Sequence, residues 1–337
     1  MKIREVKKLF VIILLSTIIS TSPAAEQSLW NAAKDGDITA AEKAIAGGAN
    51  VNAQNPSGGT ALIYACLQGD LPMIKFLLEK NADPTIKSKK DLTPILALAM
   101  SFSKKEGGVE QMFRKKESDN LVRAAQLLID AGAKVNERGG IYGETPLMRA
   151  VRKSNDAMAR TLLVYGHADV NIPESEGDKE FKNAELTPLL MAVKNRDYLM
   201  TGLLLANGAN VNLADASGGT ALMYAIENID TTIVALLLDY KANVNVQNSI
   251  LEDTPLTIAV KIAGEKMDNV LERKAAIWII NQLLKNGADA NMESDEGTPV
   301  QIAERAGDDD VVKLINDFIE KGQKEVGEET SEAPEIL

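Results

Sequence analysis

The chain has almost none of the residues on which most catalytic and metal sites depend. Among its 337 residues there is one histidine, His167, and one cysteine, Cys66. A single cysteine allows no intramolecular disulfide, and a lone histidine without a nearby cysteine does not make a metal site. The two residues lie in unrelated contexts, so a serine or cysteine nucleophile of the common kind has no base to activate it. We therefore expect no catalytic residue, no bound metal, and a small buried side chain at Cys66.

The sequence also lacks the short motifs of nucleotide-binding and hydrolytic enzymes. It contains no P-loop, no glycine-rich dinucleotide turn, no Gly-x-Ser-x-Gly elbow, no His-Glu-x-x-His helix and no paired cysteines. We expect no cofactor and no enzymatic activity. The alternative is an enzyme with an unrecognised carboxylate site, and that chemistry would require a deep pocket.

Aromatic residues are scarce. They make up 4% of the chain, whereas hydrophobic residues as a class make up 45%. This balance favours thin layers of packed helices over one large globular core, although the length would allow two globular domains.

The first 25 residues have the features of a secretory signal peptide. Four basic residues among the first eight precede an apolar run from Leu9 to Ile19, and small residues follow. Cleavage is expected after Ala24 or Ala25. The apolar run is shorter than the ~20 residues of a spanning helix, so no membrane insertion is expected after cleavage.

Removal of this segment leaves 33 Lys and Arg against 47 Asp and Glu. A surface with that excess of negative charge repels nucleic acid and anionic lipid. The sequence also has no Asn-x-Ser/Thr glycosylation site, because Asn55 is followed by proline. These features favour an exported bacterial protein, periplasmic or extracellular.

Two stretches of the chain are near copies of each other. Residues 48–65 read GANVNAQNPSGGTALIYA and residues 208–225 read GANVNLADASGGTALMYA. Further copies are marked by a threonine before Pro-Leu, Pro-Ile, Pro-Val or Ala-Leu. Three of the six spacings between successive threonines are 33 or 34 residues, and the other three are longer because those copies carry insertions. The anchors are Thr60, Thr93, Thr145, Thr187, Thr220, Thr254 and Thr298. Internal repetition at this period is typical of a solenoid.

Each copy has the signals of two short helices. Threonine followed by proline places a side-chain acceptor at the N-cap and a residue without an N–H at the first helical position. A second apolar run follows, for example Leu236 to Leu238, and a glycine such as Gly208 suits a helix end. A polar turn then leads to the next threonine. One such unit cannot bury its own faces, so stability requires stacking.

The Thr-Pro-Leu and Gly-Ala-x-Val-Asn groups resemble those of ankyrin repeats over residues 26–322. The resemblance implies an all-α repeat solenoid with β-hairpin-like fingers and about eight repeats. We expect the repeats near residues 28–58, 59–91, 92–142, 143–183, 184–218, 219–252, 253–296 and 297–322. Residues 323–337 contain five glutamates and no apolar period, which predicts a disordered acidic tail.

The resemblance also implies a non-enzymatic protein that binds other proteins through the concave face formed by fingers and first helices. The candidate partner-binding residues are Tyr64, Lys89, Lys90, Ile141, Tyr142, Met148, Arg149, Asp215, Met223, Tyr224, Asn248 and Leu251. For Tyr64 and Tyr224 the alternative is a packed structural role, because leucine normally fills that position.

An 18-residue insertion in the third copy is the one basic stretch of an acidic protein. It is either a solvated helical extension or a docking element for an acidic partner. The docking candidates are Phe102, Lys104, Lys105, Met112, Phe113, Arg114, Lys115 and Lys116.

We therefore predict a monomeric scaffold of the cell envelope with one protein partner of unknown identity. Two alternatives use the same fold: a secreted effector that acts on host proteins, and an inhibitor or immunity protein for an envelope enzyme or toxin. A cleavable signal favours the scaffold, because injected effectors often lack one.

Overall fold

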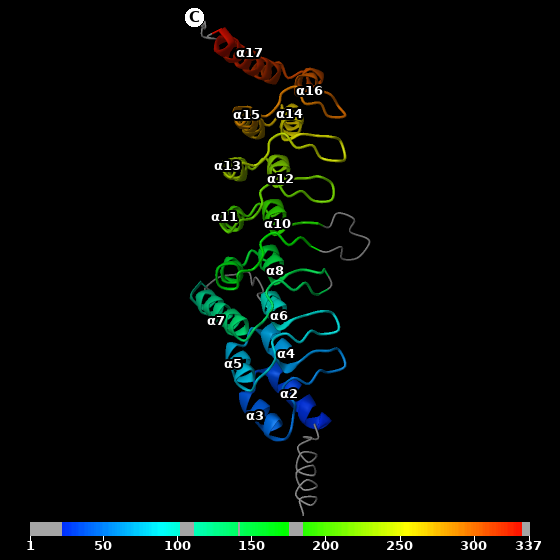
Figure 1. The fold of residues 1–337 in the computed structure, drawn as a ribbon, viewed down its shortest axis with the longest axis vertical. Coiled ribbons are helices and arrows are strands. Elements are labelled where there is room, and N and C mark those ends of the chain that lie inside the picture. Colours follow the sequence, from blue (N-terminus) through cyan, green and yellow to red (C-terminus); the bar gives the residue numbers. More distant parts are fainter. Residues whose placement is uncertain (1–21, 102–110, 141, 175–184, 332–337) are drawn as a thin grey trace, which may run out of the picture. The chain divides into compact units, whose positions relative to one another are not determined.

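Sixteen α-helices and one π-helical segment form the regular structure of the described residues. The computed structural model describes residues 22–101, 111–140, 142–174 and 185–331, and no β-strand occurs among them. The chain divides into two compact units, unit 1 at residues 1–168 and unit 2 at residues 169–337. Figure 1 shows the helices of each unit in chain order. The predicted all-α repeat fold is confirmed.

In unit 1, an inner helix and an outer helix alternate four times. The inner helices are α2 (Pro23–Asp35), α4 (Ala61–Gln68), α6 (Pro94–Ser101) and α8 (Pro146–Arg152). The outer helices are α3 (Ile38–Ala46), α5 (Leu71–Glu79), α7 (Gln111–Asp130) and α9 (Asp156–Arg160), which continues into η1 (Thr161–Tyr165). Each inner helix contacts its own outer helix and the next inner helix.

Unit 2 repeats this arrangement with four further pairs. The inner helices are α10 (Pro188–Lys194), α12 (Ala221–Glu227), α14 (Pro255–Glu265) and α16 (Pro299–Ala306). The outer helices are α11 (Tyr198–Ala206), α13 (Thr231–Asp239), α15 (Val270–Lys285) and α17 (Asp309–Ser331). The finger loops connect each outer helix to the next inner helix (Figure 1).

Seven inner helices begin at the threonines that set the repeat spacing. Each threonine side chain accepts a hydrogen bond from the backbone N–H three residues later, at 3.1–3.4 Å. An N-cap of this kind stabilises a helix by about 1 kcal/mol. The predicted helix starts are therefore confirmed.

The outer helices have caps of a different type, which the sequence analysis did not identify. An Asp or Asn side chain accepts from the backbone near the start of each of seven outer helices. These residues are Asp37, Asp70, Asn155, Asp197, Asp230, Asn269 and Asp308. Six of the eight repeats are thus capped twice, once by threonine and once by Asp or Asn; the first inner helix, α2, is capped by Ser22 instead.

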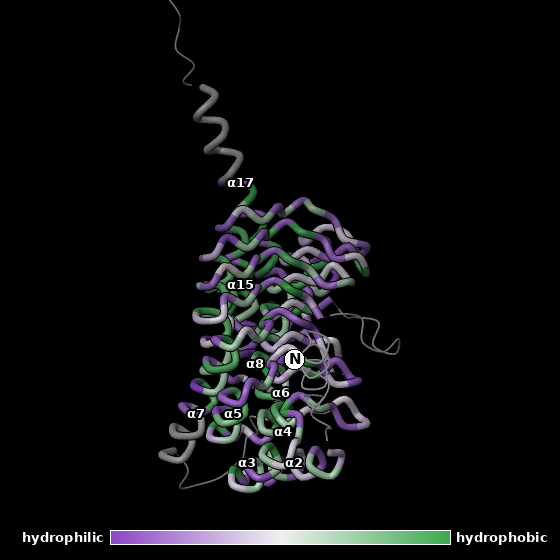
Figure 2. Tube along the Cα trace, turned by 60° about the horizontal axis from the view of Figure 1, so that its bottom comes forward, coloured by the Kyte–Doolittle hydropathy of each residue, from purple (hydrophilic) through white to green (hydrophobic). Residues whose placement is uncertain are grey.

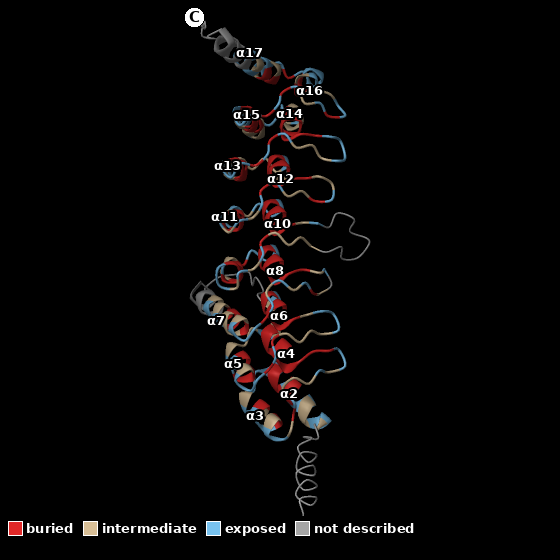
Figure 3. Cartoon of the chain, viewed as in Figure 1, coloured by how far each residue is buried: buried red, intermediate tan, exposed pale blue. Residues whose placement is uncertain are grey.

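The core follows the inner helices, which are the most deeply buried elements of each unit (Figure 3). Hydrophobic residues are concentrated along the helices (Figure 2). Cys66 on α4 is fully buried, and this burial raises the pKa of its thiol. The expectation of a small buried side chain at Cys66 is confirmed, and the neutral thiol is shielded from reagents.

The two tryptophans differ in their surroundings. Trp30 is 7% exposed and its Nε1 donates to the carbonyl of Ala53 at 3.1 Å, so it is a core residue. Trp278 is 37% exposed. The buried face of α15 follows Ala276, Ile279 and Leu283, and Trp278 lies off that stripe.

The fourth repeat has one residue more than the others between its outer helix and the alanine that follows it, Ala168. A π-helical turn accommodates this extra residue. The backbone N–H of Ala168 donates to Leu162, six residues back, whereas in the sixth repeat Ala242 donates to Leu237, five residues back. The five-residue π-helical segment η1 precedes this junction. His167 then takes φ of 51°, the left-handed conformation that Gly208 has in the fifth repeat, as a junction residue.

The seventh repeat has a lengthened, charged helix pair. Its helices α14 and α15 have 11 and 16 residues. Arg273 on α15 donates to both carboxylate oxygens of Asp308, at 2.6 and 2.8 Å. Asp308 also caps α17 through the N–H of Val311. The ion pair therefore connects helix α15 of the seventh repeat to the last repeat.

The C-terminal segment differs from the expectation of disorder. Helix α17 continues to Ser331, so residues 323–331 are helical rather than disordered. Lysine and glutamate are good helix formers, and here they extend a helix that the last repeat has already nucleated. Residues 332–337 and the signal segment 1–21 lie outside the described residues.

Candidate functional site

The fingers of unit 1 are hydrogen-bonded to one another through their backbones. The N–H of Lys89 donates to the carbonyl of Ser57 at 3.0 Å, and the N–H of Gly140 donates to the carbonyl of Lys90 at 3.0 Å. Gln54 adds a side-chain bond to the carbonyl of Lys87 at 2.8 Å. The loops are therefore ordered before any partner binds.

Unit 2 has the same ladder. The N–H of Ser249 donates to the carbonyl of Ser217 at 2.9 Å, and the N–H of Asp295 donates to the carbonyl of Leu251 at 3.1 Å. Gln247 donates to Glu293 of the next finger at 2.7 Å. Both units thus present their finger tips from fixed positions.

A tyrosine on an inner helix braces the finger in each of the two near-identical repeats. In the second repeat, the side chain of Asn55 accepts from the backbone of Ser57 and Gly59 and donates to the Tyr64 hydroxyl. Lys34 of the preceding inner helix lies 4.4 Å from the centre of the Tyr64 ring. Tyr64 is therefore half-buried and has a structural partner.

The sixth repeat has the same arrangement with an added charge. Asp215 replaces the asparagine and accepts from Ser217, Gly219 and the Tyr224 hydroxyl. Lys194 lies 3.9 Å from the Tyr224 ring and 3.8 Å from Asp215.

These contacts shift the pKa of both side chains. Burial opposes ionisation of Asp215, but the hydrogen bonds from Ser217 and Tyr224 hold its pKa below the usual value. Burial, together with the bond to Asp215, raises the pKa of Tyr224 to about 12. Asp215 is therefore a charged residue at neutral pH, fixed by donors that favour its ionised form.

Unit 1 carries an arginine cluster at its third finger. Glu144 is buried; Arg149 donates to it at 2.9 Å and Arg152 donates to its other oxygen. The Tyr142 ring is 45% exposed, and the two guanidinium groups lie 6.0 and 5.7 Å from its centre. Both arginines thus contact the one buried carboxylate of Glu144.

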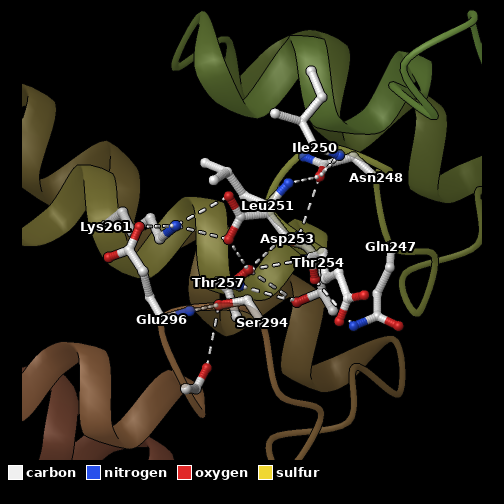
Figure 4. Close-up of polar contacts among 12 residues, drawn as sticks. Gln247, Asn248, Ile250, Leu251, Asp253, Thr254, Thr257, Lys261, Ser294 and Glu296 are labelled. Carbon is white, nitrogen blue, oxygen red and sulfur yellow. Dashed lines mark hydrogen bonds and ion pairs between the residues drawn. The ribbon is translucent and has the colours of Figure 1, made fainter.

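Unit 2 has a corresponding cluster in which carboxylates outnumber the cation (Figure 4). Lys261 lies 2.8 Å from Asp253 and 2.7 Å from Glu296 of the next finger, and Asp253 also accepts from Thr257. Burial lowers the pKa of Lys261, but the hydrogen bonds to both carboxylates outweigh it and raise the pKa overall. One lysine serves two carboxylates, so this cluster has excess negative charge.

The finger before α14 ends in an exposed apolar pair. Ile250 is 68% exposed and Leu251 is 43% exposed. The side chain of Asn248 accepts hydrogen bonds from the backbone of Ile250, Leu251 and Asp253, and thereby fixes the tip (Figure 4). The sequence analysis named Asn248 and Leu251 but missed Ile250.

The predicted partner-binding residues fall into four groups, of which the fourth, Met148 and Met223, is buried. Lys89, Lys90, Tyr142 and Leu251 are exposed on fingers, and their role stays a prediction. Tyr64, Arg149, Asp215, Tyr224 and Asn248 are held in the contacts described above. Ile141 and the insertion residues Phe102, Lys104 and Lys105 lie outside the described residues, as do the side chains of Met112, Phe113, Arg114, Lys115 and Lys116.

Two of the predictions are wrong. Met148 and Met223 are 0% and 1% exposed, so neither can contact a partner in the folded protein. Each is the third residue of its helix and faces the core, where its N–H is bound to the threonine cap.

The sequence analysis did not name Arg152 and Lys261 as site residues, although their spacing in the sequence contains a signal. Arg152 and Lys261 each lie eight residues after the carboxylate that precedes the repeat threonine.

Within the described part of the chain, no group of three or more His, Cys, Asp and Glu side chains could hold a metal ion. None of the helices described is both long enough and apolar enough to cross a membrane.

Comparison with known proteins identifies the repeats. A family model described as ankyrin repeats (3 copies) matches residues 29–123, 172–248 and 189–271, and a single ankyrin repeat model matches residues 142–175. A putative ankyrin repeat-containing protein of Treponema pallidum is 30% identical over 156 residues, which cover 46% of this chain and 43% of that protein. Protein lin-12 of Caenorhabditis elegans is 27% identical over 177 residues, 46% of this chain and 11% of that protein. The chain thus spans less than half the length of these relatives.

Solved structures share the fold. The human ASB11 ankyrin repeat domain has a TM-score of 0.55 at 22% identity and covers 77% of this chain and 97% of its own. The ankyrin repeat domain of Bcl-3 has a TM-score of 0.57 at 23% identity and covers 77% of this chain and 99% of its own.

Proposed function

We propose that this chain, which belongs to the ankyrin repeat family, is a non-enzymatic scaffold of the cell envelope that binds a protein partner through its fingers and inner helices. Ankyrin repeats are a protein–protein interaction module. A partner that meets an ordered ladder of fingers loses little additional loop entropy on binding.

The observation that carries this proposal is the apolar finger tip of unit 2. A pair of exposed apolar side chains held by three hydrogen bonds to Asn248 contributes nothing to the core. Burial of such a pair against a partner removes apolar surface from water without a cost for ordering the loop. Ile250 and Leu251 are therefore proposed as partner contacts.

The test is capture of a partner from native envelope extract by the full chain, identified by mass spectrometry. The double variant Ile250→Ser/Leu251→Ser should lose a stoichiometric partner that the wild-type chain retains. Val270 and Leu271 are 61% and 79% exposed at the start of helix α15, so Val270→Ser/Leu271→Ser is the matched control and should retain it. Equal capture by all three chains would refute a role for this finger.

The location in the envelope rests on the predicted signal peptide. Helix α2 begins at Pro23, but its first buried residue is Leu29, so none of the described residues before the expected cleavage sites after Ala24 and Ala25 is buried. Mass spectrometry of the exported chain should find an N-terminus at Ala25 or Glu26. An intact N-terminus in the cytoplasmic fraction would refute the location, and a partner found only in host extract would favour an effector.

A further inference from the structure

We propose that unit 1 contains a binding site for an acidic, extended protein segment, formed by Lys89, Lys90, Arg138, Tyr142, Arg149 and Arg152. We call these six residues the basic face. The inference rests on the proposed function, and it specifies the chemistry of the partner.

Local charge is the first argument. The chain has a formal net charge of −11, yet five of the six residues of the basic face are cationic. Lys89, Lys90 and Arg138 are exposed and pair with no carboxylate among the described residues. Arg149 and Arg152 both contact the buried carboxylate of Glu144. The positive charge of Lys89, Lys90 and Arg138 is therefore unpaired among the described residues, in an otherwise acidic molecule.

The finger backbone holds these cations beside one another. The N–H of Gly140 donates to the carbonyl of Lys90 at 3.0 Å, and a Cβ at Gly139 would overlap the carbonyl oxygen of Asp91. Such close contact between the two fingers is possible only with glycine at that position. The backbone bridge between Gly139 and Glu144 then connects this contact to the arginine cluster.

The arginine cluster is arranged to accept carboxylates next to an apolar ring. Glu144 fixes both guanidinium groups, and the Nε of Arg149 is buried with no hydrogen-bond partner in the described structure. Guanidinium groups bind carboxylates through paired N–H donors. The exposed ring of Tyr142 lies beside them and offers a surface for an apolar side chain. A segment that alternates acidic and aromatic residues fits this surface.

A protein segment fits better than a nucleic acid or an anionic membrane. At physiological salt the screening length is about 8 Å, so a short segment experiences mainly the local charge. A long polyanion or a lipid surface also meets the negative charge of the rest of the molecule, which repels it.

Unit 2 provides an internal contrast. Its corresponding fingers carry five carboxylates, Glu252, Asp253, Glu293, Asp295 and Glu296, near the two cations Lys261 and Arg305. Their charge repels an acidic segment, so binding is expected in unit 1 alone.

The test is fluorescence anisotropy of the full chain with a labelled peptide of about twelve residues that alternates Glu and Tyr. The wild-type chain should bind it, and added salt should weaken binding. Lys89→Glu/Lys90→Glu should bind at least about tenfold more weakly, because both lysines are exposed and their charge is reversed. Lys261→Gln in unit 2 is the control and should bind as the wild type does.

Three further measurements make the result decisive. Circular dichroism and thermal melting should show that Lys89→Glu/Lys90→Glu is folded, because neither side chain is buried. Arg152→Gln should also weaken binding. Equal affinity of the wild type and the double lysine variant, or tighter binding of single-stranded DNA or phosphatidylserine vesicles than of the peptide, would overturn the inference.

The inference and the proposed function fail separately. If the peptide does not bind but Ile250→Ser/Leu251→Ser still loses a captured partner, the basic face has no such role and the scaffold function stands. If the peptide binds and no protein is ever captured, the scaffold function fails.

Discussion

Asp215 and Asn55 occupy equivalent positions in two nearly identical repeats and differ by one formal charge. Both side chains accept from a serine and a glycine of the same turn and contact a tyrosine hydroxyl. Asp215 additionally lies 3.8 Å from Lys194. The pair therefore separates the contribution of charge from that of the turn itself.

Asp215→Asn should reduce stability at neutral pH by about 1–3 kcal/mol, because hydrogen bonds to a charged acceptor are replaced by neutral ones. The pKa of Asp215 is below its usual value in the folded protein, so its stabilisation is present above the unfolded pKa and is lost as pH falls through the folded pKa. Urea denaturation of both chains between neutral pH and about pH 3 should show the difference decrease on acidification. A difference that is constant with pH would contradict this.

At the scale of the element, the fourth repeat contains one extra residue. A π-helical turn accommodates it, so the repeat stays in register with its neighbours. The backbone bond of the junction, from Ala168 to Leu162, spans one residue more than the equivalent bond from Ala242 to Leu237. The glycine at 166 is required because a Cβ there would lie 2.9 Å from the carbonyl oxygen of Leu162.

Gly166→Ala should destabilise the protein by about 1–3 kcal/mol, because the added methyl group meets backbone that cannot move freely. Gly202 is a suitable control: it lies within α11, and the nearest atom to a Cβ there is 4.0 Å away. Gly202→Ala should be neutral or stabilise by about 0.5–1 kcal/mol. Thermal denaturation measures both changes, and equal effects at the two glycines would contradict the steric explanation.

At the scale of the whole molecule, stability comes from contacts between neighbouring repeats. A destabilising substitution should therefore affect mainly its own repeat and the adjacent ones. Arg273 and Asp308 connect the seventh repeat to the eighth, and the Arg273 and Asp308 side chains are 18% and 2% exposed. This pair should therefore govern how often the last repeat opens.

Arg273→Ala should reduce the stability of the last repeat by about 1–3 kcal/mol, because Asp308 is left buried without its main donor. Hydrogen exchange should accelerate in α16 and α17 and stay unchanged in α4 and α6. Lys75→Ala removes an ion pair whose side chains are 64% and 61% exposed, so as a control it should have little effect. Faster exchange throughout unit 1 would instead indicate cooperative unfolding of the whole chain.

The sequence alone determined the repeat architecture of this protein. Threonine caps, proline at the first helical turn and the 33-residue period are local signals, and each acts within a few residues of the backbone it controls. The number of helix pairs, the helix starts and the family followed from them. The helix over residues 323–331 could not be predicted in this way, because the composition of that segment is compatible with both a helix and a disordered chain.

Only the tertiary structure decided which side chains are available to a partner. Met148 and Arg149 are adjacent in sequence, yet one is in the core and the other is in an ion pair with Glu144. The direction of a side chain on a short helix depends on packing against the next repeat, and the contacts between fingers join residues more than 30 positions apart. Such contacts arise only when repeats stack, so the basic face of unit 1 and the apolar tip of unit 2 became visible in the fold.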